Sequence, residues 1–423
     1  MREMKDSGIE WIGEIPKDWE VHPVYVYFEE GKTKNYRMQE QNLLSLSYGR
    51  IIRKDINTNG GLLPASFNTY NVVEAGDIII RPTDLQNDKR SLRTGLVKEQ
   101  GIITSAYIDL RPKDNVNSKY YHYLLHSYDI IKVFYNMGNG VRQGLNFSEF
   151  AKLLLLEPTT VEQQQIADYL DTQCSEIDAT AEDIQKEIAL LEEYKKSLIY
   201  NAISNGINHS AYSNETDEVW GNVPQGWKLV DIKYLFEIVK RIAGKEGYDV
   251  LSVTQNGLKV KDITSGDGQL ADNYSGYQFV YPTDYVMNHM DLLTGWVDCS
   301  ELFGVTSPDY RVFRLMDKAA NNLVYYKYVM QCCYMNKIFY SLGQGVSNLG
   351  RWRLQTSSFN NFKVPVPPKA EQDEIADYLD SKCSEIDTLI ADKKRQLDIL
   401  ADYKKSLIYE YVTGKKEVPV KDF

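Results

Sequence analysis

The chain has 423 residues, more than one hydrophobic core usually serves, so we expect two or more domains. Hydrophobic residues make up 43% and charged residues 25%, a composition typical of folded domains that excludes a largely disordered chain. The net charge of −11 argues at first against a nucleic-acid partner, because phosphates attract Lys and Arg.

Hydrophobic runs, the N-terminal residues and the cysteines indicate where the protein is located and which kinds of site it can contain. Apolar runs fall short of the roughly 18 residues that span a membrane, and the N-terminus lacks a signal-peptide pattern, so we expect a cytoplasmic protein with no membrane partner. The five cysteines include no CxxC and the five histidines are scattered. We therefore predict neither a disulfide framework nor a metal site, and no cofactor bound by this chain.

The first 160 residues mix strand-like and helix-like runs. "WIGEIPKDWE" at 11–20 places Trp19 three residues after a proline, and we expect this tryptophan to anchor the block in its core. Strand-like runs follow at 72–80 and 101–110, then a helix-like run at 118–136. Because these runs do not alternate regularly, the sequence predicts an α+β domain instead of a doubly wound sheet.

Two features of this block resemble catalytic motifs and are better interpreted as structural. Asp77, in "EAGDIIIR", lacks the second acid and lysine that a nuclease needs, so we predict a structural turn. "GNGVRQG" at 138–144 follows a helix-like run and not a strand, so the dinucleotide-binding fingerprint fails in context. We predict no catalytic residues.

A long helix is predicted next, at 161–207. From Leu170 to Ala202, apolar residues recur at alternating steps of four and three, which is the seam of a coiled coil, and this stretch contains neither Pro nor Gly. Thr159 and Glu162 fit a capping box at its start, and Gly206 stands where helices commonly stop. At 1.5 Å per residue, 44 residues of such a helix extend about 66 Å, and so narrow an apolar stripe needs a partner along its length.

The second half of the chain repeats the first. Residues 162–200 and 371–409 are identical at 22 of 39 positions without a gap, and both end in "YKKSLIY". Fainter echoes keep the same order, such as "VWGNVPQGWK" at 219–228 for the first tryptophan motif. The chain is therefore a tandem duplication of about 209 residues.

The duplication sets the predicted domain plan. The second block has runs that correspond to those of the first block: strand-like runs at 277–280 and 310–315 and a helix-like run at 323–341. Symmetry would pair the two long helices antiparallel, with the divergent blocks at opposite ends of a rod. The predicted segments are a first divergent domain (1–160), a long helix (161–207), a second divergent domain (208–369), a second long helix (370–414) and a tail (415–423). The predicted coiled-coil seam consists of Leu170, Ile177, Ile184, Ile188, Leu191, Leu198, Leu379, Ile386, Ile390, Leu397, Leu400 and Leu407.

The acidity of the chain belongs to the two helices. Residues 162–205 hold ten acids and three lysines, and residues 371–412 hold eleven acids and six bases, which leaves +1 for the remainder. Basic, Asn- and Gln-rich loops at 81–98 and 341–363 carry the groups that contact phosphates and base edges. The candidate DNA-binding residues are Arg81, Lys89, Arg90, Arg93, Arg142, Gln143, Asn146, Lys259, Lys261, Ser347, Asn348, Arg351 and Arg353.

Together these motifs resemble one known family, the specificity subunits of Type I restriction-modification systems. The resemblance covers the whole chain and is carried by "MKDSGIEWIGEIPKDWE" at 4–20, its echo at 219–228, the "P…EQ…IA.YLD" helix entry and the repeated "YKKSLI". One departure is visible, because the "GDI" of 76–78 becomes Thr-Asp-Tyr at 283–285. That change puts the geometry of the second turn in doubt.

The resemblance implies a specific role. Each of two target-recognition domains would read one half of a bipartite site on double-stranded DNA, and the paired helices would set the spacing. Such a subunit has no catalytic site and assembles with two methyltransferase subunits and with restriction and translocase subunits. S-adenosylmethionine, ATP and Mg²⁺ would then act in the partner subunits.

Two other classes of function stay open on the residues alone. A stand-alone sequence-specific nuclease would cut DNA without partners, whereas a coiled-coil scaffold would use the divergent blocks to bind protein and no DNA. Incubation of the chain alone with Mg²⁺, ATP, S-adenosylmethionine and DNA tests the first alternative. Footprinting of its complex with the methyltransferase tests the second.

Overall fold

The structure is a computed structural model that describes residues 2–57, 66–83, 85, 91–137, 144–208, 211–255, 257–263, 271, 273–345 and 352–419. It divides into two compact units. Unit 1 comprises residues 1–184 and 395–423, and unit 2 comprises residues 185–394. Among the described helices, none is both long and apolar enough to cross a membrane.

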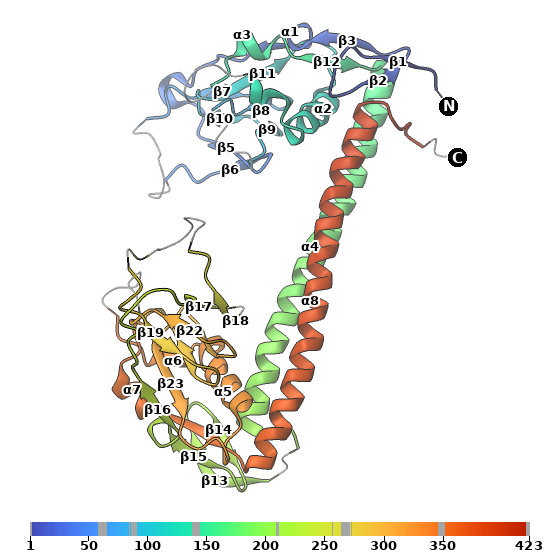
Figure 1. The fold of residues 1–423 in the computed structure, drawn as a ribbon. Coiled ribbons are helices and arrows are strands. Elements are labelled where there is room, and N and C mark those ends of the chain that lie inside the picture. Colours follow the sequence, from blue (N-terminus) through green and yellow to red (C-terminus); the bar gives the residue numbers. More distant parts are fainter. Residues whose placement is uncertain are drawn as a thin grey trace. The chain divides into compact units, whose positions relative to one another are not determined.

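Unit 1 contains short strands, a few short helices and parts of the two long helices (Figure 1). Its strands are β1 (Met4–Asp6), β2 (Glu14–Pro16), β3 (Glu20–Pro23), β4 (Phe28–Glu30), β5 (Leu44–Ser47), β6 (Arg50–Arg53), β7 (Asn71–Val73), β8 (Ile78–Ile80), β9 (Thr94–Leu96), β10 (Gly101–Ile103), β11 (Ile108–Pro112) and β12 (Leu154–Glu157). Its short helices are α1 (Val24–Tyr27), η1 (Tyr36–Met38), α2 (Ser118–Ile130), η2 (Val133–Asn136) and α3 (Phe147–Phe150).

Unit 2 repeats this order of elements with small changes. Its strands are β13 (Tyr212–Asp217), β14 (Gly221–Pro224), β15 (Lys228–Asp231), β16 (Phe236–Val239), β17 (Leu251–Thr254), β18 (Gly257–Val260), β19 (Gln278–Val280), β20 (Tyr285–Met287), β21 (Val297–Cys299), β22 (Gly304–Thr306), β23 (Arg311–Leu315) and β24 (Lys363–Val366). Its short helices are η3 (Ile232–Tyr234), α5 (Leu323–Met335), α6 (Ile338–Ser341) and α7 (Thr356–Asn360).

The strand pairings of the two units correspond one to one. The four-stranded sheet β4-β11-β8-β9 of unit 1 matches β16-β23-β20-β21 of unit 2, and every pair in both is antiparallel. The two-stranded ladders match in the same way, such as β3–β12 with β15–β24 and β5–β6 with β17–β18. The predicted α+β class and the duplicated plan are confirmed.

The long helices are α4 (Thr160–Asn205) and α8 (Lys369–Val412), whose bounds lie within two residues of the predicted segments (Figure 1). The Thr159 hydroxyl accepts a hydrogen bond from the Glu162 amide at 3.3 Å, which is one half of the predicted capping box. Both helices are followed by a glycine with positive φ, +72° at Gly206 and +69° at Gly414, the conformation that a helix end requires and that glycine adopts at least cost.

Within each unit, α4 and α8 pack antiparallel. In unit 1, Asp178 pairs with Lys404 at 2.6 Å; in unit 2, Lys195 pairs with Asp387 at 2.7 Å. Asp387 lies 209 positions after Asp178, and Lys404 lies 209 positions after Lys195. The duplication therefore repeats this ion pair, with the lysine on α8 in unit 1 and on α4 in unit 2. The buried predicted seam residues are Leu170, Ile184, Ile188, Leu379, Ile386, Ile390 and Leu407. The partly buried ones are Ile177, Leu191, Leu198, Leu397 and Leu400.

Several predicted runs are interrupted by turns. The run at 72–80 forms β7 and β8, separated by a turn in which Gly76 has φ +103°, and the run at 101–110 likewise forms β10 and β11. The helix-like runs at 118–136 and 323–341 break where Lys132 and Lys337 adopt left-handed backbone. A single non-glycine residue with positive φ ends a helix without changing its apolar pattern, so periodicity does not reveal it.

Candidate nucleic-acid interface and its helical frame

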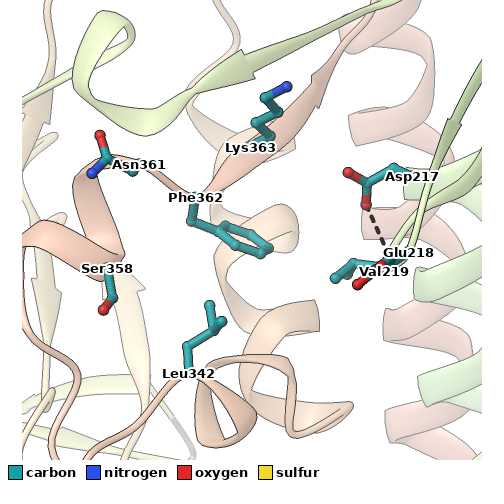
Figure 2. A pocket seen from close by; sticks show the side chains of 8 residues that line it. All are labelled: Asp217, Glu218, Val219, Leu342, Ser358, Asn361, Phe362 and Lys363. Atoms are coloured by element: carbon teal, nitrogen blue, oxygen red, sulfur yellow. Dashed lines mark hydrogen bonds between the residues drawn. The ribbon is translucent and has the colours of Figure 1, made fainter.

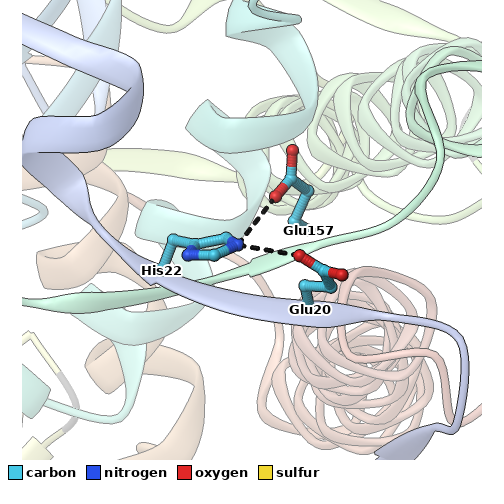
Figure 3. Close-up of side chains that lie close together, drawn as sticks. All are labelled: Glu20, His22 and Glu157. Atoms are coloured by element: carbon cyan, nitrogen blue, oxygen red, sulfur yellow. Dashed lines mark hydrogen bonds and ion pairs between the residues drawn. The ribbon is translucent and has the colours of Figure 1, made fainter.

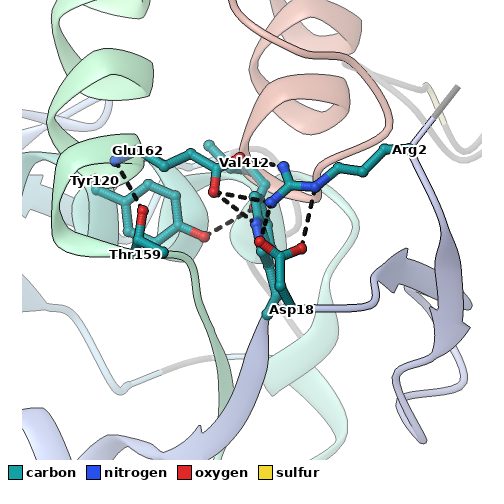
Figure 4. A network of polar contacts seen from close by, with 7 residues as sticks. Arg2, Asp18, Tyr120, Thr159, Glu162 and Val412 are labelled. Atoms are coloured by element: carbon teal, nitrogen blue, oxygen red, sulfur yellow. Dashed lines mark hydrogen bonds and ion pairs between the residues drawn. The ribbon is translucent and has the colours of Figure 1, made fainter.

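The N-terminal tryptophan motif and the helix-entry motif meet in one polar network (Figure 4). Trp19, fully buried, donates its indole N–H to Glu162 Oε2 at 2.9 Å. Arg2 pairs with the same carboxylate and with Asp18, and this raises the pKa of the Arg2 guanidinium above its ordinary value. The buried indole N–H and the first turn of α4 therefore satisfy each other's hydrogen-bonding groups, which fixes the angle at which α4 leaves the domain.

The second copy makes the same joint. Trp227 donates its indole N–H to Glu371 Oε2, also at 2.9 Å. Gln163 and Gln372, the next residues in each helix, donate their side-chain amides to the carbonyls of Pro158 and Pro367 at 3.0 Å. The repeated "P…EQ" and tryptophan motifs therefore encode a domain-to-helix joint, which explains why they persist while the surrounding sequence diverges.

Each joint also receives the end of the other long helix. In unit 1 the Tyr120 hydroxyl donates to the Val412 carbonyl at 3.0 Å, and a Cβ added to Gly414 would lie 2.4 Å from the Pro16 ring. In unit 2 the core that holds Trp227 contains Ile199 and Ile203 of α4. The repeated "YKKSLIY" segments contribute Leu407 and Ile408 to the core of unit 1 and Ile199 to the core of unit 2. Each core also contains the start of the other copy's long helix, as the antiparallel prediction requires.

The turn around Asp77 is structural. Its buried carboxylate accepts from the Glu74 amide at 2.8 Å and pairs with Arg111 at 3.2 Å. Asp284 repeats the turn, accepting from the Tyr281 amide at 2.9 Å. Thr283, which replaces Gly76 in this turn, also takes a positive φ of +76°. The doubt raised by the sequence departure is removed, because the aspartate holds the turn in both copies.

Asp109 is a buried acid beside that turn. Its side chain is 1% exposed, lies 3.8 Å from Arg111, and crowds the Cα of Gly31 so closely that a Cβ there would be 1.9 Å from Oδ2. Burial, and then the neighbouring Asp77 charge, raise the pKa of Asp109 above its usual range. Asp109 therefore fills the space between Gly31 and Arg111.

The described candidate DNA-binding residues differ in exposure. Lys259 on β18 and Arg353 are exposed, whereas Arg81 and Lys261 are partly buried. The Asn146 side chain caps α3, accepting from the Glu149 amide at 3.0 Å. Lys89, Arg90, Arg142, Gln143, Ser347, Asn348 and Arg351 lie outside the described residues.

Arg93 does not fit its predicted role. The side chain is completely buried, donates from Nε to the Tyr135 hydroxyl at 2.9 Å, and donates from Nη1 to the Thr83 carbonyl. Its guanidinium also lies 5.0 Å from the Tyr135 ring centroid. Arg93 therefore holds the segment that follows β8, and a DNA backbone cannot reach it in this conformation. The sequence of a basic loop does not show which of its cations turn inward.

An exposed hairpin was missed by the sequence analysis. The β5–β6 turn carries Tyr48, 84% exposed, and strand β6 carries Arg50 and Arg53, whose side chains are about 70% exposed. Its counterpart β17–β18 carries Lys259. The signal was present as "SYGRIIR", a Tyr-Gly turn between strand-like runs. Arg50 pairs with Asp178 at 2.9 Å and Arg53 pairs with Glu99, so these two cations would contact phosphates by exchanging those carboxylates.

A shallow depression of about 440 Å³ in unit 2 lies between the β13–β14 turn, α7 and β24 (Figure 2). Its lining includes Asp217 and Glu218 with Lys363. The Asp217 carboxylate accepts from the Val219 and Trp220 amides at 2.8 and 3.1 Å, and the Lys363 carbonyl accepts from the Trp220 indole at 2.8 Å. These groups hold the strand ends together, and the two acids disfavour a phosphate ligand.

Comparisons with known proteins agree on one family. The profile of the Type I restriction modification DNA specificity domain matches residues 52–190 and 224–398. Two proteins of Methanocaldococcus jannaschii are similar over 96% of this chain: the Type I restriction enzyme MjaVIII specificity subunit, 23% identical over 94% of its length, and the putative MjaX specificity subunit, 24% identical over 96%.

A solved structure resembles the fold over nearly its whole length. The solved structure is described as the structural basis of complex assembly and conformational transition of the type I R-M system. It matches with a TM-score of 0.64 and 13% identity, covering 95% of the present chain and 99% of that one. At this identity the likeness shows a shared fold, including the paired long helices.

Proposed function

Because this chain belongs to the family of Type I restriction-modification specificity subunits, which are non-catalytic, we propose that each of its two units reads one half of a bipartite site on double-stranded DNA. The observation that carries the proposal is the repeated joint: two divergent domains are attached to one preserved helical frame by identical tryptophan-to-glutamate contacts. Such a plan keeps the frame constant and lets the recognised sequences vary independently.

DNA contact is assigned to the hairpins and basic loops of each unit. In unit 1 the candidate DNA-contacting groups are the β5–β6 hairpin, Arg81 and Asn146. In unit 2 the candidates among the described residues are Lys259, Lys261 and Arg353. Lys89, Arg90, Arg142, Gln143, Ser347, Asn348 and Arg351 remain candidates on sequence grounds. Arginine and lysine would neutralise phosphates, and Asn or Gln would read adenine edges. We expect strong salt dependence of binding.

The long helices would set the spacing between the two half-sites. Their surfaces hold an excess of acids, so DNA is repelled from them and protein partners are favoured. Since an α-helix rises 1.5 Å per residue, removing one heptad from each helix shortens the frame by about 10 Å, close to three base pairs of DNA.

Two methyltransferase subunits would dock on the same helices. Leu190 and Tyr194 are 68% and 57% exposed on α4, and their duplicates Ile399 and Tyr403 are 60% and 51% exposed on α8. Apolar pairs at i and i+4 form one face, and such exposed faces mark interaction sites. Two equivalent faces support two equivalent partners. Restriction and translocase subunits would join this cytoplasmic complex, and S-adenosylmethionine, ATP and Mg²⁺ would act in the partners.

The spacing claim is tested by removing paired heptads, residues 181–187 of α4 together with 394–400 of α8. Both helices keep their seam register because a whole heptad is removed. Mapping DNA methylation by the reconstituted complex should give the same half-sites with a gap about three base pairs shorter. A variant that methylates different bases at the original spacing would refute the claim that the helices measure distance. Cutting or methyl transfer by this chain alone would instead support a stand-alone enzyme.

A further inference from the structure

Three potential metal ligands converge on the paired strands β3 and β12 of unit 1 (Figure 3). Glu20 and His22 project from the same face of β3, and Glu157 lies opposite Glu20 in the antiparallel register. One donor atom from each residue lies within 4.8 Å of the other two. The histidines are scattered along the sequence and so predicted no metal site, whereas the β3–β12 pairing brings His22 and Glu157 together.

The distances suit a bound transition-metal ion. His22 Nε2 lies 3.0 Å from Glu20 Oε2 and 3.3 Å from Glu157 Oε2. Zinc binds imidazole and carboxylate ligands at about 2.0–2.2 Å with tetrahedral geometry, which separates two ligand atoms by about 3.4 Å. The spacing of the imidazole from each carboxylate already approximates that of a coordination sphere.

A further residue orients one of the carboxylates. The Tyr27 hydroxyl donates to Glu157 Oε2 at 2.8 Å, and Tyr27 is 6% exposed, so its position is fixed by packing. Metal-binding carboxylates are commonly held by such outer hydrogen bonds, which tune metal affinity. The His22 and Glu157 side chains are 38% and 37% exposed, so an ion can enter from solvent.

The second copy shows that the fold does not need these three residues. In the β15–β24 ladder, Lys228 faces Val366 at the register where Glu20 faces Glu157, and Val230 occupies the position of His22. The same strand pair therefore forms with a lysine and two valines. The convergence of a histidine and two glutamates in unit 1 is an addition to the fold that requires its own explanation.

We propose that Glu20, His22 and Glu157 bind one divalent transition-metal cation such as Zn²⁺. Strand β12 ends three residues before α4 begins, so the ion would cross-link the N-terminal strand to the segment that leads into the long helix. Metal binding would stabilise unit 1 and leave unit 2 unchanged, which makes one recognition domain sensitive to metal ions and the other insensitive.

The test is Zn²⁺ titration of the full chain by isothermal titration calorimetry, with thermal unfolding as a second readout. We expect one ion per chain, at least tenfold weaker binding in His22→Val, and about tenfold weaker binding in Tyr27→Phe. His22→Val copies the valine at position 230, so it should fold. Glu29→Gln, which removes an exposed acid on neighbouring β4, is the matched control and should bind normally.

A variant with the three ligands introduced into unit 2 provides a second test. Lys228→Glu, Val230→His and Val366→Glu together should raise the stoichiometry to two ions per chain. Zn²⁺ should raise the unfolding temperature of the original chain and of Glu29→Gln but not of His22→Val. Equal Zn²⁺ binding by His22→Val and the original chain, or no saturable binding by either, would overturn the proposal.

Discussion

The joint between Trp19 and Glu162 gives the sharpest mutational prediction. Glu162→Ala removes the acceptor of a completely buried indole N–H and a partner of Arg2. A hydrogen bond to a charged group contributes about 1.5–3 kcal/mol of folding free energy. Leaving the buried donor unsatisfied costs a similar amount, but this is the same loss counted from the other side, so the two values are not added. We expect unit 1 to lose about 2 kcal/mol, which lowers its unfolding temperature by about 4–8 °C.

The assay separates the two units by hydrogen exchange of the full chain. Glu162→Ala should accelerate exchange of the α2 amides in unit 1, whereas Glu371→Ala should accelerate exchange of the α5 amides in unit 2. Glu193→Ala, which removes an exposed acid from α4, is the control. Unchanged exchange in α2 of the Glu162→Ala variant, or equal acceleration of exchange in both units by both glutamate variants, would contradict a separate joint in each unit.

Four further predictions follow from particular contacts. Burial and then the charge of Lys404 lower the pKa of His126 from 6.5 to about 4, so the stability that neutral His126 contributes is complete above pH 6.5 and is lost as pH falls from 6.5 to about 4. His126→Gln introduces the residue found at position 331. This variant should remove up to about 2 kcal/mol of the fall in unfolding free energy between pH 7 and pH 5. Gly414→Ala combines a positive φ with a contact at 2.4 Å to Pro16, and should lower the unfolding temperature of unit 1 while Gly144→Ala, with open space around its Cβ, does not. Arg353→Ala should weaken methylation at one half-site about tenfold, and equal weakening at both would contradict independent reading. Leu190→Glu with Tyr194→Ala should prevent docking of one methyltransferase subunit, and Ile399→Glu with Tyr403→Ala that of the other, as measured by the mass of the assembled complex.

Local patterns in the sequence predicted the frame well. The two long helices were predicted within two residues because heptad spacing, a capping threonine and terminal glycines are all local signals. The alignment of the two copies predicted the antiparallel arrangement through symmetry, and the Asp178–Lys404 and Lys195–Asp387 pairs follow it. Helix-forming signals act over a few residues, so they can be read without tertiary information.

Contacts distant in sequence were harder to predict. Trp19 and Glu162 each belonged to a recognised motif, but their hydrogen bond joins residues 143 positions apart. Arg93 stood in a basic loop, and only packing against Tyr135 shows that its guanidinium turns inward. Glu20, His22 and Glu157 share no motif and meet through one strand ladder. Side-chain direction in loops and pairing between distant strands depend on tertiary packing, which periodicity does not encode.

The most direct test of the proposed function is a map of modified adenines in a genome that expresses this chain with its methyltransferase subunits. We expect one bipartite motif, with two specific half-sites separated by a gap of fixed length and unspecified sequence. Replacing residues 208–368 by the corresponding domain of another specificity subunit should change one half-site and preserve the other. A continuous motif, or a replacement that changes both half-sites, would contradict the reading of DNA by two independent units on one frame.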